Sequence, residues 1–592
     1  MGGCAVLRCF DHPEKLRIKN KTMKKVLVFG AMLFMGAGLR AQTFEEAKQL
    51  LMYGRLIKAE ETLEKMVQAN PADVKATYWL GQVYLADIPM KVKSAEELYA
   101  KALTTTNQDP LILVGVGHIE LLQKKNAEAK QRFEQAIAAT KNKKNKNFGD
   151  ATILEAIGRA NALHDSQTGD VEYGLEKLGQ ASQLDPKNPN IFIDMGLAYQ
   201  KKGGEYGGPA KRAFEQAIEI APNYGRPYWR IGKIFESQKN TEMYLQYYNE
   251  AVQKDPKFAP AYLSLYQYYQ NRDVNKAKEY LDLFIANNDK DRETDFFYAD
   301  YLFRSGKNQE SINKGKEIEA GLKPGEKYAK IYKLYAFNYD RLGDSVKARD
   351  NMEIYMKDAD PEELTGDDFA TMATLYLKFP GMEEKADAQV EKAVSLDTVR
   401  ENQKGYMQAL ANAYAKQSNY KGYYKWLKRI DEITPTKSAT SYFYLADAAY
   451  RAGEYQESAV IAGKYVAAYP DQIQGYSLQR RAAVAADADT SQGTALPAID
   501  QYTQFLMRDV ESNKGRIMEN HGYKIYYFLI KSREYDKAAE SARAILAIDP
   551  ENDYAKRALS EAERLAKAKA AGKISSAPVK KPAAGLKNSV LI

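Results

Sequence analysis

The sequence is poor in the residues that most often carry chemistry. It has two cysteines in 592 residues, Cys4 and Cys9, and four histidines. No cysteine follows residue 41, so disulfides, thiolate metal sites and a cysteine nucleophile are excluded from the remainder of the chain. The histidines of that remainder, His118, His164 and His521, are far apart in sequence. We therefore expect no metal site.

The common catalytic motifs are also missing. No H-E-x-x-H, phosphate-binding loop, G-x-G-x-x-G or G-x-S-x-G stands in a context that would make it functional. Carboxylate pairs such as Glu362-Glu363 and Asp367-Asp368 fall at predicted helix starts, where negative charge complements the helix dipole. We expect a protein that is not an enzyme, with no catalytic residue and no cofactor.

Long hydrophobic runs are absent as well. The run from Val26 to Leu39 is too short for a bilayer span, which takes about 20 apolar residues. It follows Lys24-Lys25 and precedes Ala41, so we interpret residues 23–41 as a secretory signal peptide and residues 1–22 as an upstream extension. A buried helix of a cytosolic protein is the alternative. The mature chain would have no transmembrane segment, and we expect it in the periplasm or at the periphery of the outer membrane.

The charge of the chain is concentrated at its two ends. The formal net charge is +8, but residues 1–41 and the stretch after Leu565 are rich in lysine and arginine, whereas the body between them is slightly acidic. This is not the charge pattern of a nucleic-acid-binding protein. Residues 570–592 predict a flexible basic tail, either solvated or in contact with an anionic partner.

What the sequence does contain is a repeat. The pentapeptide Phe-Glu-Gln-Ala-Ile occurs at 133–137 and again at 214–218, with an alanine four residues before each phenylalanine. Other units keep the same spacing of aromatic, small and proline residues: Tyr228, Ile231-Gly232, Phe235, Tyr248, Ala251, Pro256; and Leu410-Ala411, Tyr414, Leu427, Ile430, Pro435. We count about 13 or 14 units, each of about 34 residues.

These positions resemble the tetratricopeptide repeat family, whose units follow W-x2-L-G-x2-Y, then A-x3-F, then P. The chain departs from that pattern at the first aromatic residue, which is Tyr or Phe. The resemblance implies an all-α fold, a right-handed α-solenoid of helix-turn-helix repeats over residues 42–556. A capping helix over 557–569 would end it.

The repeated letters have a physical reason. Two antiparallel helices cannot bury their own apolar face, so each unit packs on its neighbours. Small residues such as Gly196 and Gly232 are expected where two helices approach closely. Phe214 and Tyr248 are expected to fill the space between them.

The resemblance also implies a function. The chain resembles secreted or periplasmic scaffold proteins of Gram-negative bacteria. The resemblance implies that it binds segments of envelope or outer-membrane proteins in a concave groove. The alternative is a ligand-binding component of an outer-membrane uptake system, although the inserted binding region and lipid anchor of such proteins are missing. The partner, its nature as protein or glycan, and the oligomeric state stay open.

One helical face is a candidate for the groove. Arg226, Trp229 and Lys233 share a face at helical spacing, and Gln267 would extend it in the next unit. Tryptophan and arginine often dominate the energy of interfaces. We hypothesise a partner-binding site at these four residues. The alternative is that Trp229 only packs on the preceding unit.

Chaperone adaptors of the same family suggest a second set of residues to compare. Those proteins hold a partner's C-terminal carboxylate with lysines and asparagines on their first helices. Asn412 stands at one such position, but Gln408 replaces the expected lysine and Tyr444 the next asparagine. The carboxylate site is therefore not expected here.

Overall fold

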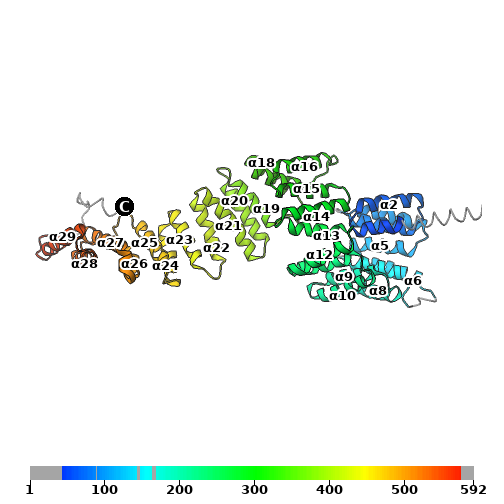
Figure 1. Cartoon of the computed structure of the whole chain (residues 1–592), viewed down its shortest axis with the longest axis horizontal. Coiled ribbons are helices and arrows are strands. Elements are labelled where there is room, and N and C mark those ends of the chain that lie inside the picture. Colours follow the sequence, from blue (N-terminus) through cyan, green and yellow to red (C-terminus); the bar gives the residue numbers. More distant parts are fainter. Residues whose placement is uncertain (1–42, 88–89, 143–146, 163–167, 575–592) are drawn as a thin grey trace, which may run out of the picture. The chain divides into compact units, whose positions relative to one another are not determined.

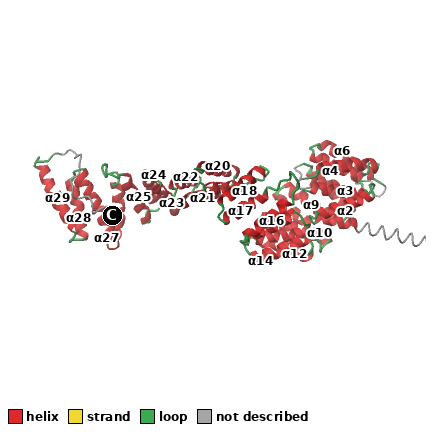
Figure 2. Ribbon diagram, turned by 90° about the horizontal axis from the view of Figure 1, so that it is seen from above, coloured by secondary structure: helices red, strands yellow, loops and turns green. Residues whose placement is uncertain are grey.

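The computed structural model describes residues 43–87, 90–142, 147–162 and 168–574, and these residues form helices and no strands (Figure 2). The expected signal peptide and residues 575–592 of the basic tail lie outside the described residues. The chain divides into two compact units, the first ending at Pro324 and the second beginning at Gly325. They are called unit 1 and unit 2 below.

Unit 1 consists of successive antiparallel helix pairs joined by short turns (Figure 1). Its pairs are 43–52 with α2 (Leu56–Ala69), α3 (Val74–Ala86) with α4 (Val92–Thr105), α5 (Pro110–Leu122) with α6 (Asn126–Thr140), α7 (Ala151–Ala162) with α8 (Val171–Leu184), α9 (Pro189–Lys202) with α10 (Gly207–Ile220), α11 (Gly225–Ser237) with α12 (Thr241–Lys254), α13 (Ala259–Tyr269) with α14 (Val274–Asn287), and α15 (Arg292–Arg304) with α16 (Asn308–Ala320).

Unit 2 continues the same arrangement and ends with a single helix. Its elements are α17 (Lys330–Arg341) with α18 (Ser345–Asp358), α19 (Gly366–Tyr376) with α20 (Glu383–Leu396), α21 (Arg400–Lys416) with α22 (Tyr420–Glu432), α23 (Ala439–Arg451) with α24 (Tyr455–Ala468), α25 (Ile473–Ala486) with α26 (Leu496–Leu506), α27 (Val510–Tyr526) with α28 (Tyr535–Ile548), and α29 (Asp553–Ala570). The described residues thus hold fourteen pairs, which confirms the predicted all-α array and its number of repeats. The residues expected for the capping helix lie within α29.

Close contact between a glycine and an aromatic ring fixes the spacing of many pairs. A Cβ atom on the glycine of the first helix would collide with a ring of the second helix: 2.2 Å from Gly81 to Tyr99, 2.3 Å from Gly196 to Phe214, and 2.4 Å from Gly232 to Tyr248. The three rings are fully buried. The predicted packing of Gly196 with Phe214 and of Gly232 with Tyr248 is confirmed.

None of the helices formed by the described residues is long and apolar enough to span a membrane. Their apolar residues instead form the buried faces between neighbouring pairs.

We expect Gly232→Ala to lower the free energy of unfolding by about 1–3 kcal/mol, because the added methyl group overlaps the Tyr248 ring. Denaturant midpoints of variant and wild type measure this. Gly179→Ala in α8 is the control, since a Cβ there meets no atom within 4 Å. It should be neutral or stabilise by up to about 1 kcal/mol. Equal midpoints for all three proteins would contradict the assigned contact.

Candidate functional site

A buried polar cluster joins the first helices of three pairs in unit 1. The guanidinium of Arg159 in α7 lies 4.4 Å from the ring centre of Trp79 in α3. It donates to Glu155 at 3.0 Å, and its Nε lies 3.3 Å from Oδ2 of Asp194 in α9. A buried charge is tolerated only when it is paired in this way. The cluster therefore ties α3, α7 and α9 together.

Burial changes the titration of this region. It raises the pKa of Asp194 to about 6, although the charge of Arg159 opposes the shift. It lowers the pKa of His118 to about 4, and the charge of Arg159 acts in the same direction. His118 is therefore neutral at pH 7, with its Nδ1 3.5 Å from Nε2 of Gln82. These groups are enclosed by protein, so they serve packing and are not open to a substrate.

The turn after the helix at 43–52 contacts the end of α12 and the start of α13. The hydroxyl of Tyr53 donates to Oδ2 of Asp255 at 2.5 Å, and its ring meets Phe258 edge-on at 5.4 Å. Burial raises the pKa of the Tyr53 phenol, and the bond to Asp255 acts in the same direction. Tyr53 is thus a buried side chain that links residues about 200 positions apart.

Asp289, in the turn between α14 and α15, completes this contact. One carboxylate oxygen pairs with Nε of Arg55 at 3.3 Å. The other accepts from the backbone N–H groups of Ile57 and Lys58 at 2.9 and 3.3 Å. These N–H groups belong to the first turn of α2, which Arg55 does not cap with its own side chain. Asp289 therefore caps α2 from a distant pair. We call the set Tyr53, Arg55, Asp255 and Asp289 the closing contact.

The predicted anchor Trp229 lies beside the closing contact. Its indole N–H donates to Oγ of Ser264 at 2.9 Å, and its ring meets Phe258 at 5.9 Å. Nη1 of Arg226 lies 2.9 Å from Sδ of Met52, in the first helix of the chain. Side chains of the first pair therefore already lie against this face.

The other two predicted residues are Lys233, which is half-buried, and Gln267. Lys233 lies 5.8 Å from the Trp229 ring centre and pairs with Glu236 at 2.7 Å. Gln267 is exposed on α13. The structure thus groups Arg226, Trp229 and Lys233 on α11, as predicted from their spacing, and Gln267 follows on the next first helix. Their role toward a partner stays a prediction.

Within the described residues of unit 2, three hollows lie along the first helices. The first hollow, of 470 Å³, lies between α19 and α21. The middle hollow, also of 470 Å³, is lined by α21, α22 and α23. The third hollow, of 250 Å³, is lined by α23, α25, α26 and α27. Neighbouring hollows share a helix, so they form a row.

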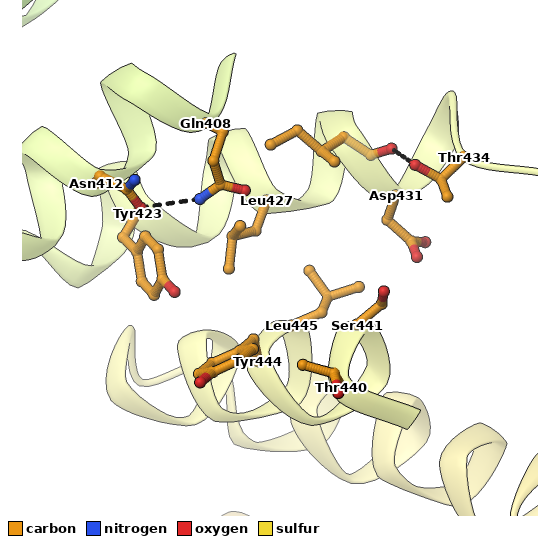
Figure 3. A pocket seen from close by; sticks show the side chains of 11 residues that line it. Gln408, Asn412, Tyr423, Leu427, Asp431, Thr434, Thr440, Ser441, Tyr444 and Leu445 are labelled. Atoms are coloured by element: carbon orange, nitrogen blue, oxygen red, sulfur yellow. Dashed lines mark hydrogen bonds between the residues drawn. The ribbon is translucent and has the colours of Figure 1, made fainter. Parts of the chain in front are cut away.

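The middle hollow combines an apolar floor with a polar rim (Figure 3). Leu427 and Tyr423 on α22 point toward Leu445 and Tyr444 on α23. Tyr444 is 53% exposed, although it is a large aromatic residue. The rim carries amides, hydroxyls and one carboxylate: Gln408, Asn412, Thr434, Thr440, Ser441 and Asp431.

Three positions that were compared with the carboxylate site of chaperone adaptors coincide with this hollow. Gln408, Asn412 and Tyr444 line the middle hollow. Gln408 donates to Asn412 at 2.9 Å across one helical turn. Gln408 and Asn412 stand three before and one after the small residue Ala411, as Trp229 and Lys233 stand about Gly232. The register found in unit 1 therefore also indicates this face.

A further hollow, of 450 Å³, lies in unit 1 at the first pair. It is lined by Thr43 and by residues of α2 and the turn after it. Within the described residues no group of three or more His, Cys, Asp or Glu side chains could hold a metal ion.

No family model matches the chain, and no curated protein matches it. Solved structures do. The C-terminal part of a TPR repeat-containing protein from Cytophaga hutchinsonii is 26% identical over 45% of this chain and 99% of its own, with a TM-score of 0.28. Yeast Tom70 is 13% identical over 72% of this chain and 99% of its own, with a TM-score of 0.34.

A third structure is that of YrrB, described as a TPR protein with an unusual peptide-binding site. It is 18% identical over 35% of this chain and 98% of its own, with a TM-score of 0.21. The fold assignment of the chain depends on its own helix pairs.

We expect Asp289→Ala to loosen the first pair of unit 1, because the variant leaves the first turn of α2 uncapped and Arg55 unpaired. The loss of a cap costs about 1–2 kcal/mol. Hydrogen exchange of residues 43–58 should become faster. Asp282→Ala is the control, because Asp282 pairs with Lys278 on the surface of α14. Unchanged exchange in Asp289→Ala would show that the closing contact does not hold the first pair.

Proposed function

We propose that the chain is a non-catalytic scaffold that binds a segment of a partner protein in the middle hollow of unit 2. The observation that carries the proposal is the exposed Tyr444 above an apolar floor made by Leu427 and Leu445. Binding pockets are typically concave, mostly apolar, and of about 300–1,000 Å³, with a few polar groups that fix the orientation of the ligand. The middle hollow has these properties.

The chemistry of the rim favours recognition over catalysis. Its amides and hydroxyls can donate to and accept from the backbone of a peptide. Its carboxylate, Asp431, pairs with Lys437 and is therefore neutralised. Large aromatic side chains such as Tyr444 and Tyr423 provide contact area at a low cost in side-chain entropy.

A comparison with unit 1 also favours the middle hollow as the binding site. On α11 the face in the equivalent register is covered by Trp229 and by residues of the first pair. On α21 the same register carries the smaller side chains Gln408 and Asn412. The face of α21 therefore leaves more space for a partner than the face of α11.

We also propose that the protein is exported to the bacterial periplasm, where its partners are envelope or outer-membrane proteins. Lys24-Lys25, the short apolar run to Leu39 and Ala41 support this proposal.

The export proposal predicts that the native protein begins at Gln42. The intact mass of protein purified from its own cells should fit residues 42–592, with or without cyclisation of the terminal glutamine. A mass that includes residues 23–41 would contradict export by this signal.

The scaffold proposal predicts that Tyr444→Ala weakens peptide binding. Twelve-residue peptides selected by display on the full chain should lose about tenfold or more in affinity for the variant. Tyr455→Ala is the control, because Tyr455 is 37% exposed on α24 and does not line the hollow. Equal affinity of wild type and a folded Tyr444→Ala variant would contradict the proposed site.

A further inference from the structure

The two outer hollows of unit 2 carry charges of opposite sign. The first hollow is lined by Asp367 and Glu401, and the third by Arg481 and Arg516. The middle hollow between them has a single charged residue on its rim, Asp431, which is paired with Lys437. The row is therefore acidic at α19–α21, neutral and aromatic at its centre, and basic at α23–α27.

These outer charges are open to a ligand. All four side chains belong to exposed residues. Glu401 pairs with Lys404 at 2.9 Å, and Arg481 pairs with Asp447 at 2.7 Å. Exposed pairs of this kind contribute only about 0–1 kcal/mol, so a charge on a ligand can share or replace them at little cost.

The hollows are spaced by the packing of helices. One helix, α21, separates the first hollow from the middle one, and α23 separates the middle hollow from the third. Packed helices lie about 8–10 Å apart. A segment in the extended polyproline II conformation covers that distance in about three residues, at about 3.1 Å per residue, and every third side chain points to the same side. One segment of about seven residues can therefore reach all three hollows.

We propose that the row binds one extended segment of a partner protein with separated charges. A basic residue lies over the first hollow, an aromatic or large apolar residue fills the middle hollow, and an acidic residue lies over the third. About two residues stand between each of these. The inference rests on the proposed function, because it assigns the partner's chemistry at the same site. Either chain direction satisfies it, since the side chains set the charge order.

The aromatic centre of the segment follows from the walls of the middle hollow. Tyr423 and Tyr444 present rings from two different helices, and Leu427 and Leu445 close the floor. An aromatic ring placed there gains edge-to-face contacts in addition to burial of apolar area. A polyanion such as a nucleic acid would meet Asp367 and Glu401 at one end of the row, where like charges repel it.

The experiment is a selection of random twelve-residue peptides displayed against the full chain. Enriched peptides should carry an aromatic or large apolar residue with a basic residue about three positions to one side and an acidic residue about three positions to the other. The same selection is repeated on Arg481→Glu combined with Arg516→Glu, where the acidic position should change to a basic one. A peptide selected on the wild type should bind this variant about tenfold more weakly at low salt.

Two matched variants complete the design. Asp367→Lys combined with Glu401→Lys should replace the basic position of the selected peptides by an acidic one. Arg557→Glu combined with Arg564→Glu makes the same charge change on α29, outside the row, and should leave the selected sequences unchanged. Melting curves test whether each variant is folded.

The outcomes separate this inference from the proposed function. Peptides that need Tyr444 but show no charge separation, or that ignore both charge reversals, overturn the inference and leave the proposed function intact. Peptides that bind independently of Tyr444, or the absence of any enriched peptide, overturn both.

Discussion

The packing of a small residue of the first helix against its neighbours sets the geometry of the array. In unit 1 the small residue is often a glycine, as at Gly232 against the Tyr248 ring. In unit 2 the corresponding residues Ala373, Ala411 and Ala446 are fully buried. Because this small residue must face the neighbouring helix, the directions of the side chains three residues before it and one residue after it are also set. The face that could meet a partner is therefore a consequence of the packing.

This constraint explains how much the sequence could predict. The helix pairs, their number and the buried aromatic residues follow from spacings within about 34 residues, and those predictions are confirmed. The closing contact could not be predicted in the same way. It joins Arg55 to Asp289 and depends on small rotations that add up over seven pairs. Asp289 lies in a stretch where the repeat pattern is weak, and nothing in its neighbours marks it.

The candidate site was predictable in register but not in location. The two cations beside Trp229 indicate a binding anchor on its helix face. In unit 2, the same face of the first helices carries the hollows. A large side chain on this face has two opposite effects on binding, however. A large ring on an inner face provides contact area, but it also fills the space, as Trp229 does against Phe258 and Ser264. Gln408 and Asn412 leave space because they are smaller. Only the three-dimensional packing decides which effect prevails.

The two units therefore use one repeat in different ways. In unit 1, the contact of Arg159 with Trp79 and the closing contact join pairs that are not neighbours in sequence, so a change in one pair is opposed by several others. In unit 2 the helices that line the row contact mainly their neighbours, and the distance between hollows depends on few interfaces. Nearest-neighbour packing lets adjacent pairs adjust by small rotations. A surface built in this way can adapt to an extended segment, whereas a closed set of pairs resists such adjustment. The open row in unit 2 therefore suits the binding role proposed for it, whereas the cross-linked pairs of unit 1 resist local rearrangement.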